Sequence, residues 1–243
     1  MVQKKRNKPF YKQFLRLRKN IQNRFKLFKF KRQKWIKFQQ YSKNQLKFYK
    51  RFKIRDQFQL SVSKFASRGN SFQRKFRNNL YEQKAFSLFY GKLKKKYLKK
   101  YVLQSVKSKS ASSKFIDFRN KTLRFFESRL DTVLYRASFS SSIRSASQLI
   151  LHGHVLVNGV PVKTKSYNLK PNDLIEITHN IKSRALVKKS IGSSNYWPIP
   201  PKHLLVNYRT LQILFVYSNS LNLMPIFNHY LNINSVITNI KKY

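Results

Sequence analysis

Hydrophobic residues recur at intervals of three and four near the start of the chain. This spacing predicts one face of an amphipathic helix, because residues three and four apart lie together on a helix. We expect the face to pack on protein, with attachment to a membrane surface as the alternative. Its aromatic rings are also suited to stacking on unpaired bases. The stripe consists of Phe10, Phe14, Leu17, Ile21, Phe25 and Phe28.

A second helix is predicted from about Leu80 to Gln104. Before it, residues 56–79 are polar and contain Gly69-Asn70-Ser71, which is typical of a poorly structured connection. After it, the serine-rich residues 105–113 have the composition of a linker. The apolar stripe of this second helix is Tyr81, Ala85, Leu88, Phe89, Leu93 and Tyr97.

Two shorter helices are predicted after Lys114. Ser142 is a suitable N-cap for the second of them, and Gly153 a suitable stop. The inward-facing residues are Leu130, Val133, Leu134 and Ala137 in the first helix, and Ile143, Ala146, Leu149 and Ile150 in the second.

Short β-strands follow these helices. Asn158-Gly159 separates the apolar runs 155–157 and 160–162 and predicts a type I′ hairpin, because both turn residues need positive φ. Pro161 cannot donate to a ladder, so its strand should lie at an edge or bulge. Pro171-Asn172-Asp173 predicts a turn into a strand at 174–177, and the run 213–217 is interpreted as a buried strand.

The predicted fold class is α+β. A helical N-terminal part with an extended basic arm precedes a small domain of two helices packed on a short twisted β-sheet. We predict an arm at 1–78, a helical segment with its linker at 79–114, the small domain at 115–178 and a C-terminal extension at 179–243, which returns onto the helical part.

The charge of the chain points to a polyanionic partner. Lys and Arg number 53 against 7 acidic residues, a formal net charge of +46 in 243 residues. Nucleic acid is the first expectation, because each phosphate contact releases condensed counterions; an anionic membrane surface is the rival. No apolar run approaches the roughly 20 residues that span a bilayer, so membrane insertion is not expected.

Nothing in the sequence predicts catalysis, a cofactor or a metal site. The chain has no cysteine and only 5 glycines, which leaves no thiolate chemistry and no glycine-rich phosphate loop. Glu127 and Asp131 are four apart and would share a helix face as an acid/base pair does, but counter-ions for neighbouring arginines are the preferred interpretation. His152-Gly153-His154 lacks a third ligand at useful spacing.

Several motifs together resemble a known family. The first set is Arg129-Leu130-Asp131, Tyr135-Arg136, the run from Ser142 to Leu149, the run from His152 to Gly159, and the run from Lys170 to Asp173. It resembles the small RNA-binding domain of small-subunit ribosomal protein four, which also occurs in pseudouridine synthases, tyrosyl-tRNA synthetases and a heat-shock ribosome-binding protein. The flanking matches, more specific to the ribosomal family, are Tyr81 to Lys84, Phe89 to Leu93, Phe126 to Ser128, and Pro201 to Tyr208.

The resemblance covers roughly residues 78–243 and implies a structural role in a small ribosomal subunit. It implies binding to the five-prime domain of the small-subunit rRNA during assembly, beside proteins near the mRNA entrance, with mRNA as a further candidate partner. The family's compact N-terminal element is replaced here by the aromatic basic arm, which puts any mRNA-unwinding role in doubt. The residues predicted to bind RNA are Arg129, Arg136, Arg144, Gln148, His152, His154, Lys163 and Lys165.

For Arg129 an ion pair with Asp131 or Glu127 is the open alternative. The acid-poor arm and the abundance of residues with AT-rich codons favour a mitochondrial over a plastid ribosome. The rival functions are an RNA-modifying enzyme and a stress-related RNA-binding module that carry the same small domain. Residues 178–243 contain no Asp or Glu, which disfavours a catalytic domain there.

Overall fold

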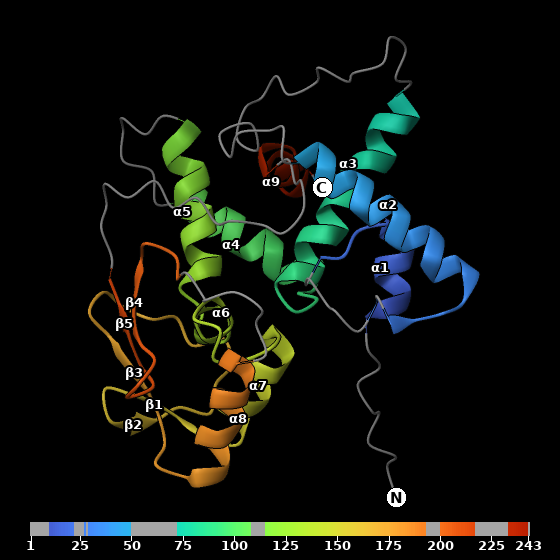
Figure 1. Ribbon diagram of the computed structural model, residues 1–243. Helices are drawn as coiled ribbons and strands as arrows, with labels where there is room; N and C mark the ends of the chain where they lie inside the picture. Colours follow the sequence, from blue (N-terminus) through green and yellow to red (C-terminus); the bar gives the residue numbers. More distant parts are fainter. Residues whose placement is uncertain are drawn as a thin grey trace, which may run out of the picture. The chain divides into compact units, whose positions relative to one another are not determined.

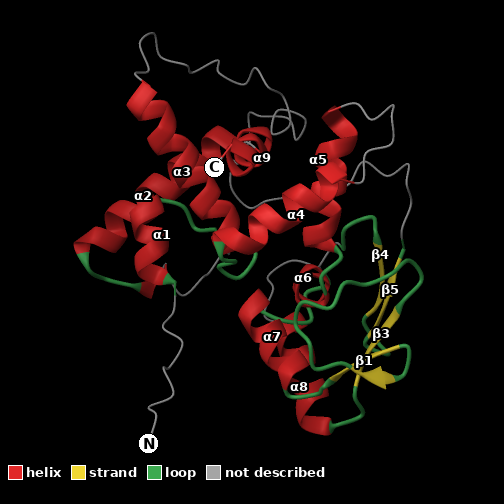
Figure 2. Cartoon of the chain, turned by 180° about the vertical axis from the view of Figure 1, so that it is seen from behind, coloured by secondary structure: helices red, strands yellow, loops and turns green. Residues whose placement is uncertain are grey.

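The computed structural model describes residues 10–21, 27, 29–49, 72–107, 115–192, 200–216 and 233–242. The chain divides into two compact units, one formed by Met1–Lys92 with Ile226–Tyr243 and the other by Leu93–Pro225. Helices and β-strands both occur, so the predicted α+β class is confirmed (Figure 1, Figure 2).

The first unit is helical where it is described. It contains α1 (Tyr11–Leu17), α2 (Gln33–Tyr49), α3 (Phe72–Phe89) and α9 (Ile233–Lys242). Helix α9 packs on α3, and the two lie side by side in Figure 1. The Ser235 hydroxyl donates a hydrogen bond to Asn79 Oδ1 across this contact, at 2.9 Å. The end of the chain therefore returns to a helix far away in the sequence.

The prediction of one continuous helix from Phe10 to Phe28 is wrong. Helix α1 ends at Leu17, because Arg18 adopts the left-handed conformation with φ 51°. Phe14 and Ile21 are nevertheless both buried, so the apolar spacing reflects a shared core rather than a shared helix. Phe25 and Phe28 lie outside the described residues.

The predicted helix at Leu80–Gln104 is two helices. Helix α3 ends at Phe89 and α4 (Lys95–Lys107) begins after a turn in which Gly91 and Lys92 have φ of 76° and 63°. Of the predicted stripe, Ala85, Leu88 and Phe89 are buried, whereas Tyr81 and Tyr97 are exposed.

The predicted connection and linker flanking that helix are in part helical. Helix α3 already begins at Phe72, so residues 72–79 are not irregular; residues 56–71 lie outside the described part. On the other side, α4 continues to Lys107. Ser105 is buried there, and its hydroxyl lies 2.8 Å from that of Thr122. Residues 108–113 are again outside the described part.

The second unit combines helices with one antiparallel sheet. Its strand order is β2-β1-β3-β5-β4, and helices α6, α7 and α8 lie on one side of this sheet in both views (Figure 1, Figure 2). After α4 its elements are α5 (Phe115–Glu127), α6 (Leu130–Arg136), α7 (Ile143–Leu151), β1 (Val155–Val157), β2 (Val160–Pro161), β3 (Leu174–Ile177), α8 (Ile181–Gly192), β4 (Leu204–Asn207) and β5 (Gln212–Phe215).

The predicted helix pair and hairpin are confirmed. All eight inward-facing residues predicted in the two short helices are buried, and Ser142 caps α7 by accepting a hydrogen bond from the Ser145 amide at 3.2 Å. Asn158 and Gly159 have φ of 50° and 80°, as a type I′ turn requires. Pro161 lies in β2, an edge strand.

The sheet extends past the predicted small domain at 115–178. Strand β5 pairs with β3 and β4 pairs with β5, so two strands from the predicted C-terminal extension complete it. Of the buried strand predicted at 213–217, the part up to Phe215 is confirmed as β5, in which Ile213 and Phe215 are buried. Tyr217 lies outside the described residues. The boundaries predicted at 78, 114 and 178 themselves remain predictions.

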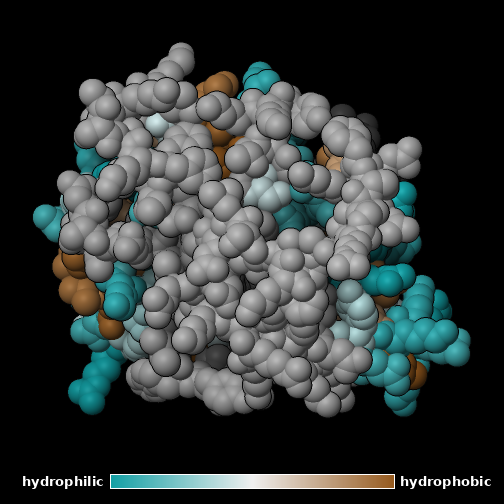
Figure 3. Space-filling view, turned by 90° about the horizontal axis from the view of Figure 1, so that it is seen from above, coloured by the Kyte–Doolittle hydropathy of each residue, from teal (hydrophilic) through white to brown (hydrophobic). Residues whose placement is uncertain are grey.

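Hydrophilic side chains dominate the coloured part of the view in Figure 3, with hydrophobic residues in small patches. None of the helices in the described part of the chain is long and apolar enough to cross a membrane.

Candidate nucleic-acid interface

One face of α7 and its C-cap carries three of the predicted RNA-binding residues. Arg144, Gln148 and His152 are spaced by four, so they follow one another along the helix. Gln148 and His152 are exposed and Arg144 is half-buried. The opposite face of α7 packs into the core of the second unit. The core therefore holds the polar face in a fixed orientation.

The turn after α7 adds further polar residues. Gly153 has φ +75°, which reverses the chain at little steric cost. The rings of His152 and His154 on either side of it lie 6.0 Å apart. A Cβ placed on Gly153 would lie 3.6 Å from Lys163 Cε, so Lys163 reaches this turn from the loop after β2. Lys165 is exposed in the same loop.

These groups suit RNA chemistry. Lys and Arg contact phosphates, and Gln and His can donate to ribose hydroxyls or bases, which is how structured RNA is usually recognised. No group of three or more His, Asp or Glu residues that could hold a metal occurs in the described part of the chain. RNA contact by any of these side chains remains a prediction.

Arg129 lies inside the protein. Its Nε and Nη2 donate to Asp131 Oδ1 and Oδ2 at 3.0 and 2.7 Å, and the two side chains are 4% and 3% exposed. Burial alone would lower the pKa of Arg129, but the hydrogen bonds and charge of Asp131, together with Tyr101, outweigh it, and the pKa is raised. The ion pair considered as the alternative for Arg129 is therefore present.

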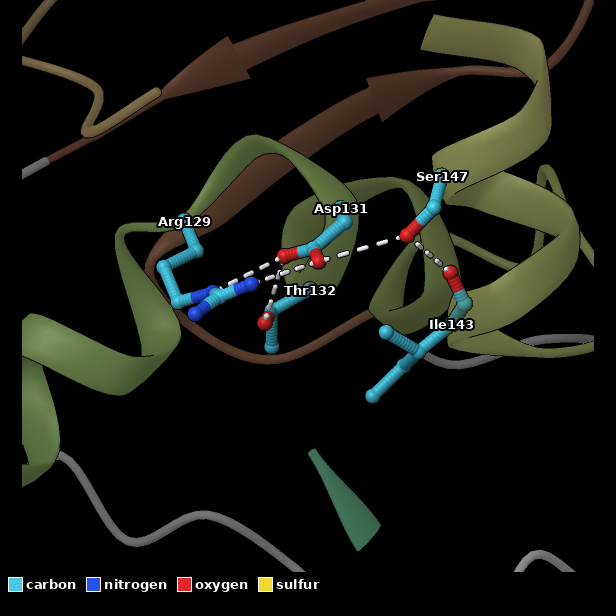
Figure 4. A network of polar contacts seen from close by, with 5 residues as sticks. All are labelled: Arg129, Asp131, Thr132, Ile143 and Ser147. Carbon is cyan, nitrogen blue, oxygen red and sulfur yellow. Dashed lines mark hydrogen bonds and ion pairs between the residues drawn. The ribbon is translucent and has the colours of Figure 1, made fainter. Parts of the chain in front are cut away.

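Asp131 connects three parts of the small domain (Figure 4). Besides Arg129, which precedes α6, it accepts a hydrogen bond from Ser147 of α7 at 3.5 Å. Ser147 also donates to the Ile143 carbonyl within α7, at 2.9 Å. The carboxylate thus ties α7, which carries the polar face, to the start of α6.

Arg136 is held in the same way. Its Nε and Nη2 donate to Glu127 Oε2 and Oε1 at 3.0 and 2.8 Å, with side chains 10% and 2% exposed. The expectation that Glu127 and Asp131 share a helix face is wrong, because α5 ends at Glu127 and α6 begins at Leu130. Each carboxylate is instead the counter-ion of one arginine, which was the preferred interpretation of the sequence.

The structure separates the eight predicted residues into two groups. Arg129 and Arg136 form buried ion pairs at the junction of α5 and α6. The other six are exposed or half-buried on α7, in the turn after it and in the loop after β2. The exposed lysines of α8, Lys182, Lys188 and Lys189, are not among the eight, because no helix was predicted there.

Sequence reasoning also gave no role to His203, which the structure buries. Among the residues that the structure describes, its Nε2 finds no hydrogen-bond partner. Burial lowers the pKa of His203; Glu127 opposes this and Arg136 adds to it. Its imidazole therefore lies near enough to the Glu127–Arg136 ion pair to interact with both charges.

We expect His203 to make the folded protein sensitive to mild acid. Because the folded-state pKa lies below the ordinary value of about 6.5, protonation of His203 favours the unfolded chain, and its contribution to stability falls as pH drops through that value. Replacing His203 with phenylalanine should reduce this pH dependence. Denaturation between pH 7.5 and 5, compared for the two proteins, measures the difference. Equal slopes of stability against pH in the two proteins would contradict the prediction. Burial raises the pKa of Glu82, which has the opposite effect on stability. This effect is the same in both proteins and cancels in the comparison.

Comparison with known proteins agrees with this geometry. Residues 128–175 match the S4 domain, so the chain carries an S4 domain built from α6, α7 and the first strands of the sheet. About half of the chain is homologous to small ribosomal subunit protein uS4. This homology confirms the resemblance that was predicted from the motifs.

The relatives include bacterial and plant proteins. Identity to uS4 of Kosmotoga olearia is 38% over 122 residues, which is 50% of this chain and 55% of that protein. For uS4 of Aquifex aeolicus it is 37%, over 50% and 54% of the two chains. For uS4c of Ceratophyllum demersum it is 38%, over 53% and 60%. The chain thus spans little more than half the length of these relatives.

Proposed function

We propose that this chain is a structural, non-enzymatic protein of a small ribosomal subunit. The observation that carries the proposal is its homology to uS4 proteins, centred on an S4 domain. Those relatives are named as ribosomal proteins, which favours this role over an RNA-modifying enzyme or a stress-related protein with the same domain. The net charge of +46 supplies the attraction to RNA.

In this proposal the S4 domain binds the five-prime domain of the small-subunit rRNA and organises it during assembly. The polar face of α7 and the loop with Lys163 and Lys165 would contact the RNA directly. Arg129 and Arg136 would act mainly by fixing the orientation of α6 and α7, because their guanidinium groups are occupied by carboxylates. Proteins near the mRNA entrance, and mRNA itself, are proposed as further partners.

We propose a mitochondrial location, on the basis of the acid-poor aromatic arm and the use of residues with AT-rich codons. Composition supports this choice. The plastid is the alternative, because the chain is also similar to chloroplast uS4c proteins.

Crosslinking tests the role and the location together. The native extract is irradiated with ultraviolet light, the protein is purified under denaturing conditions, and the attached RNA is sequenced. We expect reads at one helix junction in the five-prime domain of a mitochondrial small-subunit rRNA. Reads from a plastid rRNA would correct the location only. Reads spread over tRNAs, mRNAs or large-subunit rRNA would overturn the ribosomal role.

A further inference from the structure

The sheet has one face that none of α6, α7 and α8 covers. Side chains alternate between the two faces of a strand. The buried side chains are on the face that packs against the helices. The other face, which we name the open sheet face, carries Leu156, Leu174, Glu176, Leu205, Asn207, Gln212 and Leu214. None of its four leucines belongs to the hydrophobic core of the unit.

Three of these leucines form a continuous row. Leu174 is paired with Leu214 across β3 and β5, and Leu214 with Leu205 across β5 and β4. Side chains in such positions lie about 4.5–5.5 Å apart at Cβ. Leu205, at the sheet edge, is 60% exposed.

A carboxylate lies beside the leucine row. Glu176 is half-buried, and its Oε1 accepts a hydrogen bond from Gln212 Nε2 at 2.6 Å. Gln212 is in turn paired with Asn207 on β4. An acidic group is unusual on the surface of a chain with 7 acidic and 53 basic residues.

This chemistry is opposite to that of the α7 face. RNA presents phosphates and hydroxyls, so Glu176 repels it and the leucines gain nothing from it. A protein surface can match both features, since apolar side chains bury the leucine row and a Lys or Arg can pair with a partly buried carboxylate.

We propose that the open sheet face binds a neighbouring protein of the same particle, which covers the leucine row with apolar side chains and places a Lys or Arg at Glu176. The inference rests on the proposed ribosomal function and extends it by dividing the surface of the second unit. The α7 face binds RNA and the opposite face of the sheet binds protein.

The size of the patch fits contact within an assembly. A stable complex of two free proteins buries about 800 Å² on each partner, more than a row of leucines with one ion pair supplies. In a ribosomal particle, RNA holds both proteins in place, so a small patch with correct chemistry is sufficient.

Site-directed photocrosslinking in assembled small subunits tests the proposal. The full chain carries p-benzoylphenylalanine in place of Leu205 or, as the matched control, in place of Gln148 on α7. We expect position 205 to crosslink to one other small-subunit protein and position 148 to rRNA. The inference would be overturned if position 205 crosslinked to RNA, to a second copy or to another part of this chain. It would also be overturned if position 205 gave no crosslink. A chain that is absent from small subunits would overturn the proposed function, and the inference with it.

The charge of Glu176 gives a second readout. In the chain with the crosslinker at position 205, Glu176→Lys should reduce the protein crosslink at least fivefold, because it places like charges together. Glu176→Gln keeps the shape and should reduce the crosslink less. An unchanged crosslink in the Glu176→Lys chain would contradict the ion pair. The rRNA crosslink from position 148, measured with the same substitutions, should stay constant and shows that the S4 domain remains folded.

Discussion

Replacing Asp131 with alanine is expected to lower the free energy of unfolding of the second unit by about 3–5 kcal/mol. The substitution leaves the guanidinium of Arg129 buried without a counter-ion, since Asp131 accepts two hydrogen bonds from it. It also removes an acceptor from Ser147. Denaturant-dependent hydrogen exchange at the amides of α6 and α7 measures this loss within the full chain.

Two variants make the result specific to the buried charge. Glu176→Ala also removes a carboxylate with one hydrogen-bond partner, but from a half-exposed position, and should cost less than about 1 kcal/mol. The double variant Arg129→Met with Asp131→Leu should recover most of the lost stability, because it removes the unpaired charge. If Asp131→Ala destabilised the unit no more than Glu176→Ala, the ion pair would not be what fixes α6 and α7.

The local features of the S4 domain could be predicted because short-range chemistry determines them. A serine before an apolar run caps a helix through its own hydroxyl, as Ser142 does for α7. Asn158-Gly159 determines its turn because both residues tolerate positive φ. Asn158 further donates to Asp173 Oδ1 at 2.9 Å, so two motifs that were recognised separately are joined in the fold.

The helix boundaries outside this domain could not be predicted in the same way. Helix α1 ends where Arg18 turns left-handed, and α3 is separated from α4 where Gly91 and Lys92 do so. Arginine carries no local preference for that conformation, so the end of α1 had no local signal. Gly91 is a usual helix stop, but the apolar spacing continues past it and was followed instead. Of these two helix ends, only the one at Gly91 was therefore marked in the local sequence.

The candidate site shows the same division between local and long-range information. The spacing of Arg144, Gln148 and His152 on one helix face follows from periodicity alone. The burial of Arg136 does not, because its partner Glu127 lies nine residues away on another helix. A sequence that is rich in arginine does not indicate which few are removed from solvent; the acidic residues identify them, since a buried arginine needs a carboxylate.

Replacing Arg144 with glutamate is expected to weaken binding to the target rRNA fragment by about 2–3 kcal/mol, or roughly 30- to 150-fold. The change removes one cationic contact and adds repulsion from phosphate. The fold should be retained, because Arg144 is the second residue of α7 and a carboxylate in the first turn of a helix is favourable. Filter binding over a range of salt concentrations measures the affinity, and its dependence on log salt should become shallower by about one unit or more.

Lys188→Glu on α8 is the matched control for Arg144→Glu, because it changes the net charge equally at an exposed position on a different helix. It should weaken binding only a fewfold, through the long-range field. If the two variants lost affinity equally, overall charge rather than the α7 face would account for RNA binding. An affinity of the Arg144→Glu protein within threefold of the unmodified chain at physiological salt would remove Arg144 from the interface. The selective loss expected here requires that phosphate approach α7 closely, because screening reduces the effect of a charge beyond about 8 Å at that ionic strength.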